Sequence, residues 1–317
     1  MCTAISYLGH YFGRNLDLEY SYGESVVITP RNYPFRFANG MLFPTHHALI
    51  GMAYICGDYP LYYDGINEKG LAMAALSFPE NAVYREKDAH RINIAPYELF
   101  PYILGQCENT EDARRLLADI NLWNEPFSDA LPLTPLHFII SDKHRALTLE
   151  STEKGIFLYE NPVGVLTNSP PFDFQMQYLN LFMGLSEKTP ENRFSQKIAL
   201  QPYSRGMGAL GLPGDLSSPS RFVRAVFTKY HSVIGKTEKE NLSQFFHLLG
   251  AVEQQKGCVE VNGKYEYTVY SSCCDTLRGI YHYTTYDDRS IVSANLFDYD
   301  LESDKLAVAS VLPKITP

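Results

Sequence analysis

The chain has 317 residues, of which 45% are hydrophobic and 20% charged, and its formal net charge at pH 7 is -9. This composition excludes a disordered chain and supplies enough apolar residues for a sizeable core. The negative charge argues against a nucleic-acid partner, because phosphate binding needs a concentrated basic surface.

The N-terminal sequence has neither a charged n-region nor an apolar h-region, so we expect no signal peptide. No apolar run approaches the roughly 20 residues that a membrane-spanning helix needs. We therefore expect a soluble cytoplasmic protein without stable membrane association. The six cysteines lack regular spacing and are expected to be reduced. Because Cys-x-x-Cys and His-Glu-x-x-His are both absent, we expect no metal and no cofactor.

Strand-like stretches cluster near both ends of the sequence, and three more lie in the middle. They cover residues 2–7, 24–29, 48–54, 71–77, 136–141, 146–150, 156–160, 265–273, 279–285, 290–296 and 305–311. Helical periodicity fills the gaps between them. The expected helices are one over 110–120 that Thr110 caps, 172–183, 221–233, and one that begins with the capping box Thr237–Glu240.

Blocks of antiparallel-looking strands that alternate with helix pairs predict an α+β architecture, with two stacked sheets covered by helices on the outside. No linker rich in Pro, Gly or Ser divides the sequence, so we expect a single domain over residues 1–317. Residues 185–203 are polar and lack strong periodicity. This segment is either an extended excursion that packs against something else or a floppy surface loop.

Cys2 is the most informative residue for function. Removal of Met1, which the small side chain at position 2 permits, would make Cys2 the N-terminus. One residue would then carry both a thiol nucleophile and a free amine that can act as its base. Thiols titrate near ~8.5 and α-amines near ~7.7 to 8.0, so each is close to its reactive form at neutral pH. The alternative is that Cys2 is incidental, since chain termini are usually disordered.

Residues 206–211 match the dinucleotide-binding pattern Gly-x-Gly-x-x-Gly. That motif requires a strand before it and a helix after it, so that the phosphates meet a helix N-terminus. The sequence on either side predicts neither element. We therefore interpret the match as accidental and do not expect an oxidoreductase.

Five motifs occur in order along the chain: Met1–Thr3, Phe12–Asp17, Asp64–Leu71, Leu166–Pro170 and Leu212–Phe222. In combination they resemble the choloylglycine hydrolase family, which contains bile salt hydrolases and penicillin V acylases. The resemblance implies an N-terminal nucleophile hydrolase with an αββα four-layer sandwich of two antiparallel sheets between helix layers. It is strongest to the bile salt hydrolases of Gram-positive bacteria.

The resemblance also assigns roles to three residues around the thiol. Cys2 is expected to attack an amide carbonyl and form a thioester that water then cleaves. Arg14 is expected to favour the thiolate through its positive charge, and Asp17 to accept a hydrogen bond from the free amine and orient it. Without the resemblance, Arg14 and Asp17 would be interpreted as a plain surface ion pair.

The spacing of Arg14 and Asp17 raises a geometric difficulty. Positions three apart on an ideal strand point to opposite faces, so a regular strand could not bring both side chains to Cys2. We therefore expect the strand to end or bulge near Asn15–Leu16. A regular strand through Asp17 would count against the assignment.

Asn168 resembles the side chain that donates to the oxyanion in this family, and Arg221 resembles a second cation near the centre. Taken alone, Asn168 would be a turn residue and Arg221 a solvated helix residue. Residue 77 departs from the pattern, because bile salt hydrolases normally carry Asn-Phe-Pro where this chain has Ser77-Phe78-Pro79. Serine is shorter and offers a hydroxyl in place of an amide, whereas a contribution of the backbone N–H of residue 77 would survive this change, so we expect retained but altered activity.

The resemblance implies a conjugated bile salt as substrate, with glycine conjugates preferred over taurine conjugates. Leu16, Phe127, Leu131 and Leu136 are expected to line the pocket for the steroid. Arg205 lies in Ser-Arg-Gly, which the resemblance associates with glycine preference, since a guanidinium can hold a carboxylate in bidentate fashion. Residues 185–203 resemble an assembly extension, which implies a homotetramer.

Two other functions remain open at this stage. A penicillin V acylase or another N-acyl amidase of the family would use the same catalytic residues. A catalytically silent binding protein would keep the fold, and it would be indicated by retention of Met1, because a blocked amine removes the base.

Overall fold

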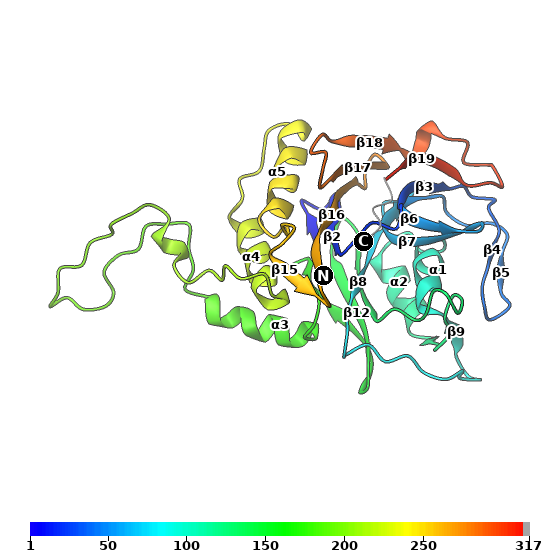
Figure 1. Ribbon diagram of the computed structural model, residues 1–317, viewed down its shortest axis with the longest axis horizontal. Coiled ribbons are helices and arrows are strands. Elements are labelled where there is room, and N and C mark those ends of the chain that lie inside the picture. Colours follow the sequence, from blue (N-terminus) through cyan, green and yellow to red (C-terminus); the bar gives the residue numbers. More distant parts are fainter. Residues whose placement is uncertain (313–317) are drawn as a thin grey trace.

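The computed structural model describes residues 1–312 and contains two large antiparallel sheets that lie between layers of helices (Figure 1). The first sheet has seven strands in the order β14-β1-β2-β16-β17-β18, with β15 paired to β16. Their bounds are β1 Cys2–Tyr7, β2 Tyr11–Leu18, β14 Val165–Leu166, β15 Val259–Val261, β16 Lys264–Asp275, β17 Ile280–Thr285 and β18 Val292–Asn295.

The second sheet has eight strands in the order β13-β12-β11-β8-β7-β6-β3-β19. Their bounds are β3 Ser25–Thr29, β6 Leu49–Cys56, β7 Tyr59–Asn67, β8 Ala72–Ser77, β11 Leu136–Ser141, β12 Ala146–Thr152, β13 Gly155–Glu160 and β19 Ala307–Val311. Two short pairs complete the strands: β4 Phe35–Arg36 with β5 Leu42–Phe43, and β9 Ile92–Ile94 with β10 Ile120–Leu122.

The helices form the two outer layers. Three helices lie on the side of the seven-stranded sheet: α3 Phe172–Leu179, α4 Ser218–His231 and α5 Glu238–Gly250 (Figure 1). Two helices lie beyond the eight-stranded sheet: α1 Leu99–Leu104 and α2 Thr110–Leu117. Short 3-10 helices are η1 Pro96–Glu98, η2 Asn180–Phe182, η3 Met207–Ala209 and η4 Leu296–Asp298.

Two apolar cores hold these layers together. One contains residues of both sheets together with buried side chains of α3, α4 and α5, such as Phe172, Phe222 and Phe245. The other packs α1 and α2 on the eight-stranded sheet, with Ile103 and Leu117 among its members. Each helix layer therefore buries one apolar face and each sheet buries both of its faces, and the predicted αββα sandwich is confirmed.

Most of the predicted elements are present, and the differences are local. The capping box Thr237–Glu240 begins α5 as predicted. The helix α2 is capped by Asn109, whose side chain accepts from two backbone N–H groups, so the prediction of Thr110 as its cap is wrong. The helix α4 begins at Ser218, three residues before the predicted start. The strand β7 and the helix α1 were not predicted.

Between η2 and α4 the chain forms a long excursion that projects from the helical layer (green to yellow in Figure 1). Residues 185–203 contain no helix or strand, which is compatible with both of the alternatives predicted for this segment. The glycine-rich run 206–211 also lies here, with only η3 inside it and no strand before it. In residues 1–312 no helix is both long and apolar enough to cross a bilayer.

Candidate active site

Cys2 begins β1, which lies inside the seven-stranded sheet between β14 and β2. Its side chain is 2% exposed and faces Leu16 across the β1–β2 ladder. Met1 continues this ladder by one residue: its amine donates to the Asp17 carbonyl at 2.8 Å, and the Asp17 N–H donates to the Met1 carbonyl at 2.9 Å. Asp17 thus lies beside the residue whose removal would free the Cys2 amine.

The surroundings of Met1 and Asp17 are largely dry. Burial lowers the pKa of the Met1 amine below its ordinary value, although the nearby Cys2 and Asp17 oppose this shift. Burial likewise raises the pKa of the Asp17 carboxyl, against the opposing charge of the amine. One carboxylate oxygen accepts from the Thr268 hydroxyl at 2.6 Å, and the other is buried without a partner in residues 1–312. Asp17 therefore has one oxygen available for a further donor.

Arg14 lies on the same face of the sheet as the Cys2 thiol. In the β1–β2 ladder Cys2 pairs with Leu16 and Ala4 pairs with Arg14, and residues two apart along a strand share a face. This face is directed toward the eight-stranded sheet. The guanidinium and the thiol thus occupy the same inter-sheet layer.

The Arg14 guanidinium is fully buried and is held by backbone carbonyls. It donates to the carbonyls of Asn15 at 3.4 Å and Tyr63 at 3.1 Å, and also to that of Ala75. Its Nη2 is buried without a hydrogen-bond partner in residues 1–312. Burial disfavours the charged form, but the charge of a neighbouring Cys2 thiolate helps to raise the pKa of Arg14 above its ordinary value. Arg14 is therefore a permanent cation in this layer.

The prediction that the strand ends or bulges near Asn15–Leu16 is wrong. The strand β2 continues through Asp17 to Leu18, and the irregularity lies in the partner strand β16, where the register shifts between Thr268 and Tyr270. Arg14 and Asp17 accordingly point to opposite faces. The prediction of a break rested on the idea that both side chains reach the Cys2 thiol. In the structure Arg14 lies on the face of the thiol, and Asp17 lies beside Met1 at the end of the chain.

Asn168 and Arg221 form a buried network around the backbone of Cys2. The Asn168 Oδ1 accepts from the Cys2 N–H at 2.7 Å and from the Arg221 Nη2 at 2.7 Å. The Arg221 Nη1 donates to the Cys2 carbonyl and to the Thr3 hydroxyl, each at 2.6 Å. Burial lowers the pKa of Arg221, although Asp17 and Cys2 oppose this shift. Arg221 thus joins the start of α4 to the start of β1.

Ser77 enters the network through its backbone. The Asn168 Nδ2 donates to the Ser77 carbonyl at 2.7 Å, which leaves the second hydrogen of that amide for another acceptor. Ser77 ends β8 and pairs with Leu136 on β11, so Leu136 lies next to this group. In residues 1–312 the Ser77 hydroxyl makes no hydrogen bond. The observed contact is made by the Ser77 carbonyl, so the expected contribution of the Ser77 N–H stays a prediction.

The other predicted pocket residues are more scattered. Leu16 is 3% exposed opposite Cys2. Phe127 packs against Tyr59 and Tyr97, with ring centroids 5.6 and 5.1 Å apart. Leu131 lies in a turn and is partly buried.

Arg205 belongs to the excursion between η2 and α4. It is exposed, and in residues 1–312 its side chain makes no hydrogen bond or ion pair. A single copy of the chain therefore does not bring Arg205 into the network around Cys2.

Sequence reasoning missed the groups that hold Arg14 and Asp17. A register shift in the β6–β7 ladder leaves Tyr63 without a pairing partner on β6, and its carbonyl accepts from Arg14. Such a bulge re-aims backbone groups beside functional sites. Thr268, the partner of Asp17, is 251 residues away in the chain. Only the fold connects these residues, so no local pattern could have identified them.

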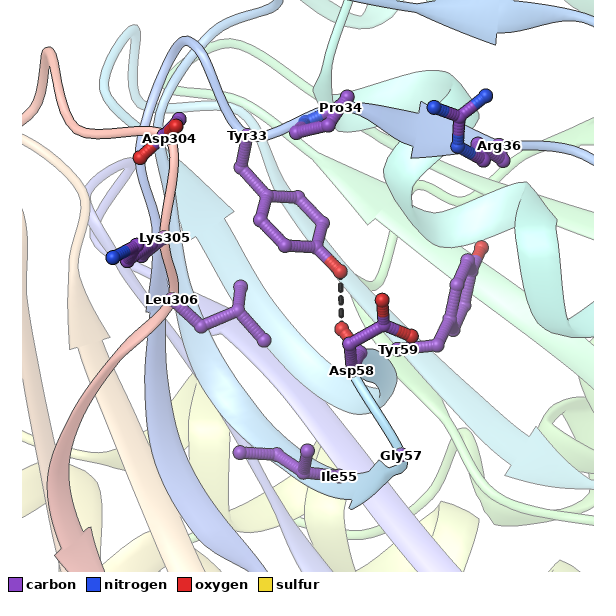
Figure 2. Close-up of a pocket in the computed structure, with 10 residues that line it drawn as sticks. All are labelled: Tyr33, Pro34, Arg36, Ile55, Gly57, Asp58, Tyr59, Asp304, Lys305 and Leu306. Atoms are coloured by element: carbon purple, nitrogen blue, oxygen red, sulfur yellow. Dashed lines mark hydrogen bonds between the residues drawn. The ribbon is translucent and has the colours of Figure 1, made fainter.

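A cavity of about 590 Å³ lies elsewhere, between the β6–β7 turn and residues 304–306. Figure 2 shows its lining, where the Tyr33 hydroxyl donates to the Asp58 carbonyl. None of the residues predicted for the site lines this cavity. The cavity is connected to the predicted site residues only indirectly, because Tyr59 in its lining contacts Phe127.

Comparison with known proteins gives a consistent result over nearly the whole chain. A family model for linear amide C–N hydrolases, the choloylglycine hydrolase family, matches residues 2–309. The bile salt hydrolase/transferase of Lactiplantibacillus plantarum is 52% identical over an alignment of 309 residues that covers 96% of this chain and 95% of that protein. The conjugated bile acid hydrolase of Lactobacillus gasseri is 37% identical over an alignment of 316 residues that covers 96% of this chain and 99% of that protein.

Solved structures agree with these sequence matches. The C2A mutant of the conjugated bile acid hydrolase from Clostridium perfringens superposes with a TM-score of 0.90 at 33% identity, covering 98% of this chain and 97% of that chain. The penicillin V acylase from Agrobacterium tumefaciens has a TM-score of 0.75 at 20% identity and covers 96% and 90% of the two chains. The second likeness concerns the fold alone.

Proposed function

Because this chain belongs to the choloylglycine hydrolase family of linear amide C–N hydrolases, we propose that it hydrolyses the amide bond of conjugated bile salts with Cys2 as nucleophile. Relatives named as bile salt or conjugated bile acid hydrolases support this substrate class. The observation that carries the proposal is the side chain of Asn168, which contacts the Cys2 N–H, the Ser77 carbonyl and Arg221 together.

Removal of Met1 prepares the nucleophile. It converts the Cys2 N–H into a free amine beside Asp17 and Asn168, and the unpartnered oxygen of Asp17 can accept from that amine. A neutral amine can take the proton of the thiol through a bridging water.

Acylation follows from the positions of the charged groups. The thiolate, favoured by the Arg14 cation in the same layer, attacks the amide carbonyl and forms a C–S bond. The oxygen that becomes negative accepts from the second N–H of the Asn168 side chain, with the Ser77 N–H as a further donor. Collapse of the tetrahedral intermediate breaks the C–N bond, and the protonated Cys2 amine gives its proton to the leaving amine. This leaves a thioester on Cys2.

Water completes the cycle. The neutral Cys2 amine accepts a proton from a water molecule while the water oxygen attacks the thioester carbonyl. The same donors stabilise the oxyanion that forms. The C–S bond then breaks, the free acid leaves, and the thiol recovers its proton. The protein groups that take part in the cycle belong to Cys2, Arg14, Asp17, Asn168 and Ser77.

A side-by-side assay tests the substrate. The purified enzyme should hydrolyse glycocholate with a kcat/KM well above that for phenoxymethylpenicillin, and Cys2→Ala should abolish both activities. Preference for phenoxymethylpenicillin would replace the proposal with a penicillin V acylase of the same machinery. An inactive wild type that retains Met1 would instead indicate a binding protein.

We infer that glycine conjugates are preferred over taurine conjugates through Arg205. Its guanidinium can hold a planar carboxylate in bidentate fashion. Because Arg205 lies on the excursion, this contact requires the excursion of one copy to approach the site of another. Arg205→Ala should lower kcat/KM for glycocholate about 10-fold, as for the loss of one charged contact. A taurocholate preference in the wild type would exclude this role.

We also infer a homotetramer built through the excursion. Large apolar side chains are exposed on and beside it, including Met183 at 82%, Phe194 at 82% and Tyr203 at 83%. Large apolar side chains that are exposed together on one projecting segment favour a protein contact, because water solvates them poorly. An apolar cavity of about 310 Å³ between η2 and α4 is lined in part by Met183, and it has room for a side chain of a second copy. Sedimentation of the full chain should give four copies. The cytoplasmic location expected from the sequence stays a prediction.

A further inference from the structure

We propose that His137, paired with Glu150, is a positioning residue that holds the two sides of the oxyanion site together. The inference deepens the proposed hydrolase mechanism and rests on it. His137 lies on β11 and Glu150 on the neighbouring β12, and their side chains are 1% and 0% exposed. Neither residue belongs to the motifs that identify the family in the sequence.

The first side of the site is the peptide unit between Thr167 and Asn168. The His137 Nε2 lies 2.9 Å from the Thr167 carbonyl, and the Asn168 N–H donates to the Ser218 Oγ at 2.8 Å. Both polar groups of this peptide unit are therefore held. The direction in which the Asn168 side chain leaves the backbone is thereby fixed relative to β11.

The second side is the segment that presents Ser77. Phe78, the next residue, is fully buried, and its ring stacks on the His137 imidazole with centroids 4.3 Å apart and planes 6° from parallel. The Ser77 carbonyl accepts from the Asn168 Nδ2. One imidazole ring therefore contacts the neighbours of both residues that meet at the proposed oxyanion site.

Both ring nitrogens of His137 are held by oxygen atoms. The Nδ1 lies 3.0 Å from the Glu150 Oε1 and the Nε2 lies 2.9 Å from the Thr167 carbonyl, so the ring is fixed from both sides. Glu150 also accepts from the Phe172 N–H at 3.0 Å, which ties this arrangement to the start of α3.

This arrangement contacts the oxyanion side of the site directly and reaches the thiol side only through Asn168, which accepts from the Cys2 N–H. In residues 1–312 no hydrogen bond joins His137 or Glu150 to Cys2, Arg14 or Asp17. Loss of the His137 contact should therefore displace Asn168 while the charges around the thiol stay in place. The chemical step should slow much more than thiol reactivity, because Arg14 and Asp17 keep their own contacts.

Two substitutions at the same position separate the contributions. His137→Phe keeps a ring to stack on Phe78 but removes both hydrogen bonds. His137→Gln keeps an amide N–H that can reach the Thr167 carbonyl but removes the stack. His144→Phe is the matched control, because His144 is exposed in the β11–β12 turn. For each variant we would measure kcat and KM for glycocholate, the rate of Cys2 alkylation by iodoacetamide, and the melting temperature.

We expect His137→Phe to lower kcat about 10- to 100-fold, less than the loss of an oxyanion donor itself, with KM and the alkylation rate changed by less than about twofold. His137→Gln should recover most of kcat, and His144→Phe should match the wild type. The proposal is overturned if His137→Phe keeps the wild-type kcat, or if kcat, alkylation and folding fall together in both variants. If the wild type cleaves only phenoxymethylpenicillin, the proposed substrate is wrong, and the same kcat comparison on that amide decides the role of His137.

Discussion

Substitution of Arg221 by lysine tests the network around Cys2 most sharply. The guanidinium donates to the Cys2 carbonyl, the Thr3 hydroxyl and the Asn168 Oδ1 at 2.6 to 2.7 Å. A lysine keeps the charge, but its single nitrogen cannot reach acceptors that two guanidinium nitrogens share. At least one buried acceptor therefore loses its partner.

The magnitude follows from these contacts. A hydrogen bond to a charged group contributes about 1.5–3 kcal/mol, so the loss of one or two should lower the free energy of unfolding by about 2–5 kcal/mol. Asn168 should also lose its fixed orientation. Because removal of a whole oxyanion donor lowers kcat about 10²- to 10³-fold, displacement of this donor should lower kcat about 10- to 100-fold.

The assay compares Arg221→Lys with Arg224→Lys, one turn further along α4. Arg224 also donates to backbone carbonyls, those of Pro213, Asp215 and Ala251, but contacts none of the proposed catalytic residues. Urea unfolding should show that both variants are destabilised, and only Arg221→Lys should lose kcat on glycocholate. A wild-type kcat in Arg221→Lys, or equal losses in the two variants, would refute the reasoning.

Three further predictions concern the carboxylate, the departure from the family pattern and the excursion. Burial raises the pKa of the Asp17 carboxyl in the folded state. The protonated carboxyl therefore stabilises the folded protein fully below the pKa of about 3.9 that Asp has in the unfolded chain, and this stabilisation is lost as the pH rises through the pKa of the folded state. Thermal melts should therefore show that Asp17→Asn gains stability relative to the wild type as the pH rises from 4 to 7. The kcat of this variant should fall about 100-fold or more. A difference in melting temperature that does not change with pH would contradict the burial argument. Ser77→Asn adds a donor at the site and should change kcat by about two- to tenfold in rate assays, and identical kinetics would mean that the side chain at position 77 is irrelevant. The double variant Phe194→Ser, Tyr203→Ser should sediment as a smaller species than both the wild type and the control Phe297→Ser, and an unchanged sedimentation coefficient would exclude the excursion as the contact.

Local signals in the sequence were sufficient for much of the fold. The capping box Thr237–Glu240 predicted the start of α5, since both of its hydrogen bonds are made within one turn. The strand β7 was missed because Pro60 and Gly65 argue against a strand. In the structure Pro60 lies near the start of β7, and Gly65 lies opposite Gly51, where a side chain would collide with the Ile50 carbonyl.

The site was predictable in its residues but not in its geometry. Motif order indicated Cys2 and Asn168, whose atoms meet 166 positions apart in the chain. The expected break in β2 was wrong because the bulge lies in β16, which no pattern near Arg14 or Asp17 could reveal. His137 and Glu150 escaped notice for a related reason. A buried histidine and glutamate on neighbouring strands acquire significance only through their contacts.

Mass spectrometry of the acid-quenched enzyme during turnover of glycocholate tests the central claim most directly. The account predicts that the chain lacks Met1 and that the N-terminal peptide carries a bile acyl group on Cys2 as a thioester. Hydroxylamine should remove this adduct, and Cys2→Ala should show neither the adduct nor turnover. Full activity in a chain that retains Met1, or turnover by Cys2→Ala, would contradict the account.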